Sequence, residues 1–241
     1  MKTLLITGAT GFVGRHLVEH ALEHGYKVVA SIRSSSNISW LKERNIPIAM
    51  LSLSDPEKLV LELKNVVETH GKIDVVIHNA GITQSLNPDD YYHVNYILTK
   101  ILFNTLQKID ITPPKFIFVS SIATVGPGNP ISLVPINEDD DPHPVTHYGK
   151  SKLKAEQFIK AQNKLPWIIL RPTVVYGPRE TNFFNMIKAI NRGFEFYIGS
   201  KNQMLSFIYV DDLADVVVKM CGNTKSNQIY NVSDGLAYSA V

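Results

Sequence analysis

The sequence predicts an α/β protein built on a doubly wound, mostly parallel sheet of the Rossmann type. Short apolar and β-branched runs alternate with longer runs of helical periodicity, which predicts strand–helix–strand units. Each predicted strand is almost continuously apolar, as expected for strands that helices cover on both faces. A glycine-rich turn joins the first strand to the first helix, at the sheet edge where such folds bind ligands.

The first part of the chain shows this alternation most clearly. The first strand leads into a helix at 12–24, and Gly25 is placed to end that helix. The Asp55-Pro56 pair has the cap-then-proline order that begins a helix, and Gly71 stands where this helix ends. The expected strands are at 3–7, 28–32, 47–51, 75–78, 116–120 and 167–171, and the expected helices are at 12–24, 37–44, 56–70, 89–108 and 146–162.

After the last of these strands the pattern loosens, because prolines and glycines interrupt it. A helix at 211–220 and a strand at 228–232 are still expected. We expect a dinucleotide-binding domain at 1–171 and a partial substrate-binding region at 172–241, of which about 205–225 returns to the core. Near the end of the sequence a serine precedes an apolar pattern and resembles the N-cap of a helix that the sequence does not contain. We therefore expect the sequence to be a truncated form of the protein.

Composition excludes several classes of protein. Hydrophobic residues make up 44% of the 241 residues and the formal net charge is only +2, which excludes a disordered chain. The single cysteine, Cys221, excludes a disulfide scaffold and is expected to be buried. The near-neutral charge gives no reason to expect a nucleic-acid partner. Apolar runs are too short for a membrane span or a signal peptide, so we expect a cytoplasmic protein without a membrane partner.

The glycine-rich turn has a spacing that suits a bound pyrophosphate. Gly8 suits a tight turn, Gly11 lets the backbone approach a phosphate, and Gly14 lets the helix pack closely on the sheet. The free N–H groups at the helix N-terminus would then face the pyrophosphate. The spacing is GxxGxxG rather than GxGxxG, so the general fingerprint is not met letter for letter. A purely structural role for these glycines is the alternative.

Together with this turn, five further motifs resemble the extended short-chain dehydrogenase/reductases, the NAD-dependent epimerase/dehydratase family. They follow the family order and extend the resemblance to the end of the chain: His78-Asn79-Ala80-Gly81, Ser120-Ser121, Tyr148-Gly149-Lys150-Ser151-Lys152, Arg171-Pro172 with Tyr176-Gly177-Pro178, and Tyr209-Val210-Asp211-Asp212-Leu213-Ala214. The resemblance implies an NAD(P)-dependent enzyme. It also implies cofactor contacts from Gly8, Thr10, Gly11, Phe12, Val13, Gly14, Arg33, Ser34, Ser52, Leu53, Asn79, Ala80, Gly81, Asn95, Tyr148, Lys152, Arg171 and Pro172.

Tyr148 and Lys152 are the candidate catalytic pair. Their spacing of four places them on one face of the predicted helix at 146–162. A phenol has an ordinary pKa near 10, and a neighbouring ammonium would stabilise the phenolate and lower that pKa. The resemblance implies that Tyr148 is the general acid/base and that Lys152 assists it and holds the nicotinamide ribose. Ser121 would orient the substrate oxygen, with Ser120 as the alternative hydroxyl.

The end of the second strand selects the cofactor. An acidic residue there binds the ribose hydroxyls of NAD, whereas an arginine accommodates the 2′-phosphate of NADP. Ile32 stands at the position where an NAD-binding protein has its acidic residue, and Arg33 and Ser34 follow it. We therefore expect NADP to be preferred, with NAD as the alternative. The other reading of this arginine is a solvated surface residue. The resemblance implies that Ser52, which replaces an Asp of the family pattern, lies near the adenine. For Asn95 the alternative to a cofactor contact is a buried packing role.

Departures from the family pattern bear on the substrate. Val174 stands where sugar-nucleotide members often have Asn, and Leu205 lies near where they often have Arg. Burying a diphosphate without such donors is costly. This favours a less charged alcohol or ketone as the small-molecule substrate. The two residues after Ser121 replace the Asp-Glu pair of dehydratases. Arg179 and Arg192 still offer phosphate contacts, so nucleotide sugars stay an alternative.

These observations give three functional hypotheses. The first is an oxidoreductase that transfers hydride at a secondary alcohol or ketone, with Tyr148 as acid/base. The second is a nucleotide-sugar epimerase or dehydratase with tightly bound NAD. The third, of another class, is a non-catalytic NADP(H)-sensing protein, against which Ser121, Tyr148 and Lys152 argue because a sensor needs no proton relay.

Two weaker patterns complete the sequence. His143 and His147 are four residues apart, but Pro144 lies between them, so we predict no metal site there or elsewhere. The predicted helix at 89–108 is similar to helices that pack across a dimer in the family, and this resemblance implies a homodimer.

Overall fold

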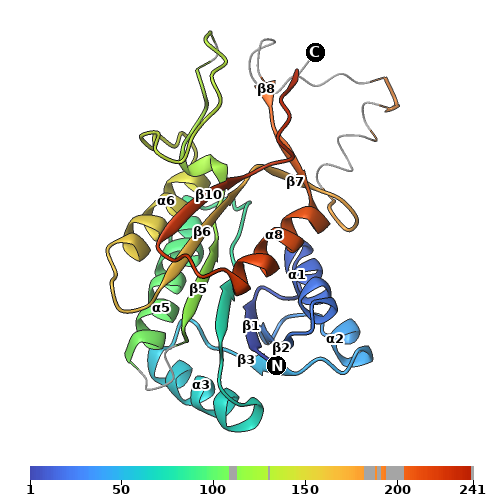
Figure 1. The fold of residues 1–241 in the computed structure, drawn as a ribbon, viewed down its shortest axis with the longest axis vertical. Coiled ribbons are helices and arrows are strands. Elements are labelled where there is room, and N and C mark those ends of the chain that lie inside the picture. Colours follow the sequence, from blue (N-terminus) through green and yellow to red (C-terminus); the bar gives the residue numbers. More distant parts are fainter. Residues whose placement is uncertain (109–112, 130, 182–187, 189–190, 194–203, 240–241) are drawn as a thin grey trace.

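A parallel sheet of seven strands forms the centre of the computed structural model, in the order β10-β6-β5-β4-β1-β2-β3 (Figure 1). The structure describes residues 1–108, 113–129, 131–181, 188, 191–193 and 204–239, and parts of the predicted region at 172–241 lie outside them. The strands are β1 (Thr3–Thr7), β2 (Lys27–Ile32), β3 (Ile48–Met50), β4 (Val75–His78), β5 (Lys115–Val119), β6 (Trp167–Pro172) and β10 (Gln228–Val232). The predicted doubly wound sheet is therefore confirmed, with each of these strands where the sequence placed it.

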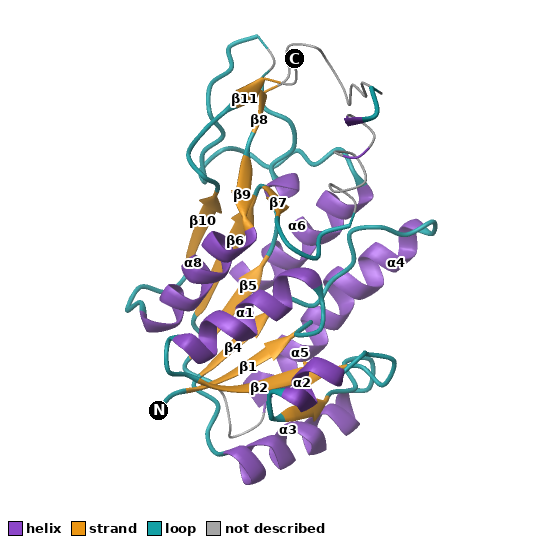
Figure 2. Cartoon of the chain, turned by 90° about the vertical axis from the view of Figure 1, so that its right-hand side faces the viewer, coloured by secondary structure: helices purple, strands orange, loops and turns teal. Residues whose placement is uncertain are grey.

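Helices cover both faces of the sheet (Figure 2). Side chains of β1 alternate between two apolar cores, because Leu4 and Ile6 face one layer of helices and Leu5 faces the other. The first layer is α1 (Phe12–Glu23), α2 (Ser39–Glu43) and α8 (Val210–Gly222). The second layer is α3 (Pro56–His70), α5 (Leu98–Lys108) and α6 (His147–Lys160). Burial on both faces explains why these strands are continuously apolar.

The helix predicted at 89–108 is confirmed as one unbroken helical run, but part of it is π-helical. It consists of α4 (Pro88–Tyr92), a π-helical turn (His93–Ile97) and α5. The buried Asn95 lies in this turn, accepts from Ile82 N at 2.9 Å and donates to Ile82 O at 3.0 Å and Ser151 Oγ at 3.0 Å. The Asn95 side-chain amide thus satisfies the backbone N–H and C=O of Ile82 in the loop after β4, and it joins this loop to α6. Sequence periodicity alone did not reveal these contacts.

Short elements beyond β6 lie above the carboxyl ends of the sheet strands (Figure 2). They are β7 (Val174–Tyr176), which pairs in parallel with β9 (Phe207–Tyr209), and β8 (Met204–Leu205), which pairs antiparallel with β11 (Tyr238–Ser239). A single 3-10 turn (Ile122–Thr124) follows β5. The sequence did not predict these pairs, because strands of two or three residues carry too little periodicity.

Gly14 allows α1 to lie against the turn after β1, as its position predicted. A Cβ at Gly14 would lie 1.9 Å from the carbonyl oxygen of Gly8, a backbone atom that cannot move aside cheaply. We expect Gly14→Ala to lower the free energy of unfolding by about 1–3 kcal/mol, measured by urea denaturation. Gly222→Ala is the matched control, because a Cβ there meets only Tyr26 Oη at 3.7 Å. It should be neutral or stabilising by up to about 1 kcal/mol, since helical alanine is favoured over glycine.

Equal losses in the two variants would show that the close approach of Gly14 to Gly8 does not limit stability.

Candidate active site

A cavity of about 1640 Å³ lies at the carboxyl ends of β1, β2, β4 and β5. The final residues of these strands line it, together with the loop after β5 and the short elements beyond β6. This is the sheet edge where the sequence predicted the site. The predicted residues that line the cavity are Gly8, Thr10, Gly11, Phe12, Val13, Arg33, Leu53, Asn79, Ala80, Gly81, Ser121, Tyr148, Lys152 and Pro172.

The glycine turn forms a backbone cradle at the start of α1. Gly8 has a φ of +68°. It lies so close to the turn after β4 that a Cβ on Gly8 would be 2.9 Å from Ala80 Cα. Gly11 is the N-cap of α1 and supplies no side chain to bind the first N–H groups of the helix. Free donors and a positive helix end facing a cavity fit the pyrophosphate of a dinucleotide.

A buried hydrogen-bond relay fixes the strand ends beneath this cradle. His78 Nδ1 lies 2.7 Å from Thr7 Oγ1 and His78 Nε2 lies 2.9 Å from Thr99 Oγ1. Ala80 N donates to the same Thr7 hydroxyl at 3.2 Å. Burial, with a smaller contribution from Lys152, lowers the pKa of His78 to about 3, so its ring is neutral and acts as a link. The sequence showed His78 only as part of a motif and gave no sign of this link.

Tyr148 and Ser121 both line the cavity and interact through their side chains. Burial raises the pKa of the Tyr148 phenol, and the hydrogen bond with Ser121 opposes this without overcoming it. We expected a neighbouring ammonium to lower this pKa, and the structure corrects that expectation. Lys152 Nζ instead donates to Val119 O at 2.8 Å and lies 4.6 Å from the centre of the Phe118 ring.

Lys152 is itself perturbed by its surroundings. It is buried, and burial lowers the pKa of its ammonium to about 8, while the Glu156 carboxylate acts in the opposite direction. An ammonium has three donors, and Val119 O uses one of them. Two protons therefore remain for a ligand in the cavity that Lys152 lines.

Arg171 does not reach the cavity, although the sequence predicted it as a cofactor contact. It is 2% exposed, and its guanidinium binds Glu156 through Nε at 3.1 Å and Nη2 at 2.7 Å. Ser120 Oγ donates to the same carboxylate at 2.5 Å, which leaves Ser121 as the hydroxyl beside Tyr148. Glu156 was not predicted as a site residue, although its place four residues after Lys152 puts it on the same helix face.

Other predicted cofactor contacts also lie outside the cavity lining among the described residues. Gly14 packs against Gly8, and Asn95 has the packing role named as its alternative. Ser52 is bound through its N and Oγ to Glu62, at 2.6 and 2.9 Å. Ser34 is exposed but does not line the cavity, whereas its neighbour Ser36 does.

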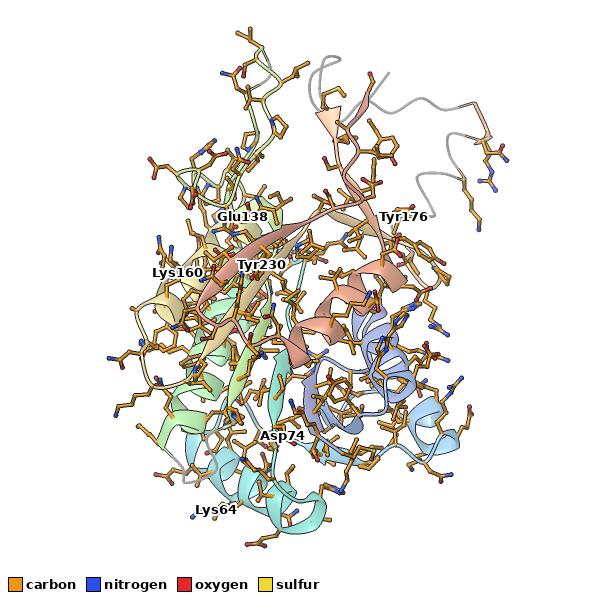
Figure 3. All side chains as sticks on the ribbon, in the orientation of Figure 1. Lys64, Asp74, Glu138, Lys160, Tyr176 and Tyr230 are labelled. Atoms are coloured by element: carbon orange, nitrogen blue, oxygen red, sulfur yellow. The ribbon has the colours of Figure 1, made fainter. Side chains whose placement is uncertain are left out.

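The loop after β5 forms the side of the cavity opposite the glycine turn, and it is hydrogen-bonded to β10. Glu138 lies beside this strand (Figure 3) and accepts from Asn231 N at 2.7 Å. The side-chain amide of Asn231 donates to Ile136 O at 3.3 Å. Asn231 also lines the cavity, and its buried Oδ1 has no hydrogen-bond partner among the described residues.

His143 in this loop does not offer a ring nitrogen to a metal. Its Nδ1 lies 2.9 Å from Asp141 O and its Nε2 lies 3.1 Å from Pro127 O. These backbone carbonyls raise the pKa of the imidazole, because they accept from its protonated form. His147 instead packs its ring against Tyr92 at 6.2 Å.

The sheet order, the backbone cradle and the Ser121–Tyr148–Lys152 cluster define a Rossmann-type, dinucleotide-dependent enzyme. The chain belongs to the NAD dependent epimerase/dehydratase family, whose model matches residues 4–233. This membership confirms the resemblance to the extended short-chain dehydrogenase/reductases and the prediction of an enzyme. It also argues against the non-catalytic sensor.

Several relatives and solved structures are similar to this chain. It is 31% identical to UDP-glucose 4-epimerase from Vibrio cholerae, over 97% of this chain and 71% of the relative. It is 28% identical to sterol-4-alpha-carboxylate 3-dehydrogenase, decarboxylating, from Dictyostelium discoideum, over 98% of this chain and 72% of the relative. The solved UDP-glucuronic acid 4-epimerase from Bacillus cereus in complex with NAD has a TM-score of 0.78 and 27% identity, covering 99% of this chain and 79% of that one. Within the described residues, no helix is long and apolar enough to span a membrane.

Proposed function

We propose that this enzyme oxidises or reduces a secondary alcohol or ketone, with Tyr148 exchanging the proton at the substrate oxygen. The observation that carries this proposal is the interaction of Ser121 with Tyr148 in the same cavity as the glycine cradle. When bound, a nicotinamide supplies the hydride acceptor or donor. The dinucleotide would lie along the cradle, with Gly11 beside its pyrophosphate and Lys152 beside the nicotinamide ribose.

The raised pKa of Tyr148 means that its phenol is protonated before the reaction. A phenol that is protonated at neutral pH is ready to donate its proton to a carbonyl oxygen as that oxygen gains negative charge. Ser121 holds the same oxygen in place and stabilises the phenolate that remains. In the oxidative direction the phenolate takes the proton of the alcohol, so the same two side chains serve both directions.

The substrate side of the cavity supports a weakly charged substrate. Arg179 lines it but lies 3.5 Å from the Glu19 carboxylate. The apolar side chains of Val174, Leu205, Leu133 and Leu236 line it too. We propose an alcohol or ketone with substantial apolar surface, which those side chains would contact.

A nucleotide-sugar 4-epimerase is the second candidate, and the 31% identity to a UDP-glucose 4-epimerase favours it. Both candidates share the oxidation step, and they differ in whether the ketone leaves or is reduced again on its other face. Incubation with UDP-glucose, followed by nuclear magnetic resonance of the sugar, would detect an epimerised product. A carbonyl panel with NADPH, followed at the nicotinamide absorbance, would detect a reductase. The homodimer predicted from the resemblance stays a prediction.

We propose that NADP is the preferred cofactor, with Arg33 binding its 2′-phosphate. Arg33 is exposed, follows β2 and lines the cavity, and its own N–H donates to Ser36 Oγ at 3.1 Å. Hydrogen bonds to charged groups contribute about 1.5–3 kcal/mol. We therefore expect Arg33→Ala to weaken NADPH binding by roughly 10–100-fold and to leave NADH binding unchanged. Fluorescence titration of the nicotinamide measures both.

Arg44→Ala is the matched control for this titration, because Arg44 is exposed but does not line the cavity. It should bind both cofactors like the wild type. Equal or tighter NADH binding that Arg33→Ala does not change would overturn the NADP preference and favour the epimerase candidate with NAD.

A further inference from the structure

A row of histidines, His16 and His20 on α1 and His24 at its C-cap, faces the acidic side of α8. Their spacing of four residues places the three side chains on one face. Asp211 and Asp215 lie opposite them, and α1 and α8 lie side by side over the sheet (Figure 1). None of these histidines lines the cavity among its described residues. The proposed catalysis leaves this row without a role.

The outer end of the row brings three potential metal ligands together. One ligand atom each from His20, His24 and Asp215 can be chosen so that all lie within 4.8 Å of one another. The side chains are 19%, 39% and 32% exposed, so an ion from solvent can reach them. His20 lies on α1, His24 is its C-cap and Asp215 lies on α8, so the packing of these two helices brings the three groups together.

The hydrogen bonds of His24 set which nitrogen is available. Its Nδ1 lies 2.8 Å from His20 O, and a carbonyl only accepts, so Nδ1 carries the proton. In the neutral ring, Nε2 then presents a lone pair, and it lies 3.4 Å from Asp215 Oδ1. Two lone pairs facing one another are repulsive, and the charge-assisted hydrogen bond of a protonated ring would be nearer 2.7–2.9 Å.

The distance fits two ligands of one metal ion. Zinc holds nitrogen and oxygen ligands at about 2.0–2.1 Å, so neighbouring corners of its tetrahedron lie about 3.3–3.4 Å apart. The Nε2–Oδ1 separation of 3.4 Å between His24 and Asp215 matches that edge. Lys219 Nζ binds the other oxygen of Asp215, Oδ2, at 2.5 Å and leaves Oδ1 to an ion. His20 Nδ1 is buried without a hydrogen-bond partner among the described residues.

We propose that His20, His24 and Asp215 bind one divalent transition-metal ion of the zinc class, which joins α1 to α8. Two imidazoles and one carboxylate select such an ion over Mg²⁺ or Ca²⁺, which prefer oxygen ligands alone. Asp211 accepts from His16 Nδ1 at 2.6 Å and lies 3.4 Å from His20 Nε2, so it orients the row from its inner end. Because the ion would bind the folded chain and not the unfolded one, it would raise the free energy of unfolding.

Zinc titration of the full chain tests this proposal without any activity assay. The chain, freed of any affinity tag and stripped with a chelator, is titrated with Zn²⁺ at pH 7.5 against a chromophoric competitor, and its Tm is followed. We expect one Zn²⁺ per chain and a Tm that rises with Zn²⁺ but not with Mg²⁺. Loss of an outer-shell partner already costs roughly 10–100-fold in metal affinity, so His24→Gln and Asp215→Asn should each weaken binding at least about tenfold.

His93→Gln is the control. His93 is an exposed histidine in the π-helical turn, so its variant should bind Zn²⁺ like the wild type. The proposal is wrong if the wild type shows no zinc-dependent rise in Tm, or if His93→Gln weakens binding as much as His24→Gln.

Discussion

Replacing Tyr148 with phenylalanine should reduce kcat by about 10²–10⁴-fold and leave the affinity for NADPH nearly unchanged. The ring and its contact with Tyr91 at 6.4 Å are kept, so only the hydroxyl is lost. The burial that raises the pKa of this phenol keeps it protonated at neutral pH, where it can protonate the substrate oxygen. Steady-state kinetics with the best substrate of the panel, combined with nicotinamide fluorescence, measures both quantities.

Tyr92→Phe is the matched control for this experiment. Its ring packs against His147 rather than lining the cavity, and the substitution also removes one phenol hydroxyl. Tyr92→Phe should therefore keep its turnover. If Tyr148→Phe kept full turnover as well, Tyr148 would not be the proton donor, and the Ser121 hydroxyl would become the first candidate. A loss of NADPH binding in Tyr148→Phe would contradict a purely chemical role.

The parts of the fold that the sequence predicted well depend on local signals. Continuous apolar runs mark strands such as β1 because helices bury both faces of the sheet. The Asp55 cap and Pro56 fixed the start of α3 at the predicted residue, because both act within one turn. Likewise, successive parallel strands end at one edge, which brings Gly8 and Ser121 to one cavity.

The contacts that the sequence did not predict join segments distant in the chain. Arg171 was predicted as a cofactor contact, and its motif gave no sign of the carboxylate that meets it, Glu156 on α6. The π-helical turn at Asn95 was missed for a similar reason, since the loop after β4 provides its partners. The contact of His16 on α1 with Asp211 on α8 likewise depends on the packing of the two helices. No local period encodes such contacts.

The buried pair of Glu156 and Arg171 is expected to give the largest effect on stability. Both side chains are at most 2% exposed, and Glu156 also accepts from Ser120. Glu156→Ala would leave the guanidinium buried without a counter-ion, and breaking such a pair costs about 3–5 kcal/mol. Urea denaturation should show that loss in the free energy of unfolding. The carboxylate also raises the pKa of Lys152, so its removal should lower that pKa further below about 8.

The double variant Glu156→Leu/Arg171→Met separates a lost attraction from an uncompensated charge. Replacing a buried ion pair with apolar residues of similar volume is often neutral or stabilising, so the double variant should recover most of the lost stability. This recovery is expected because Arg171 Nη1 already lacks a hydrogen-bond partner among the described residues, and the pair is therefore not fully satisfied. A double variant as unstable as Glu156→Ala would show instead that the hydrogen bond from Ser120, rather than the unpaired charge, holds β5 to α6.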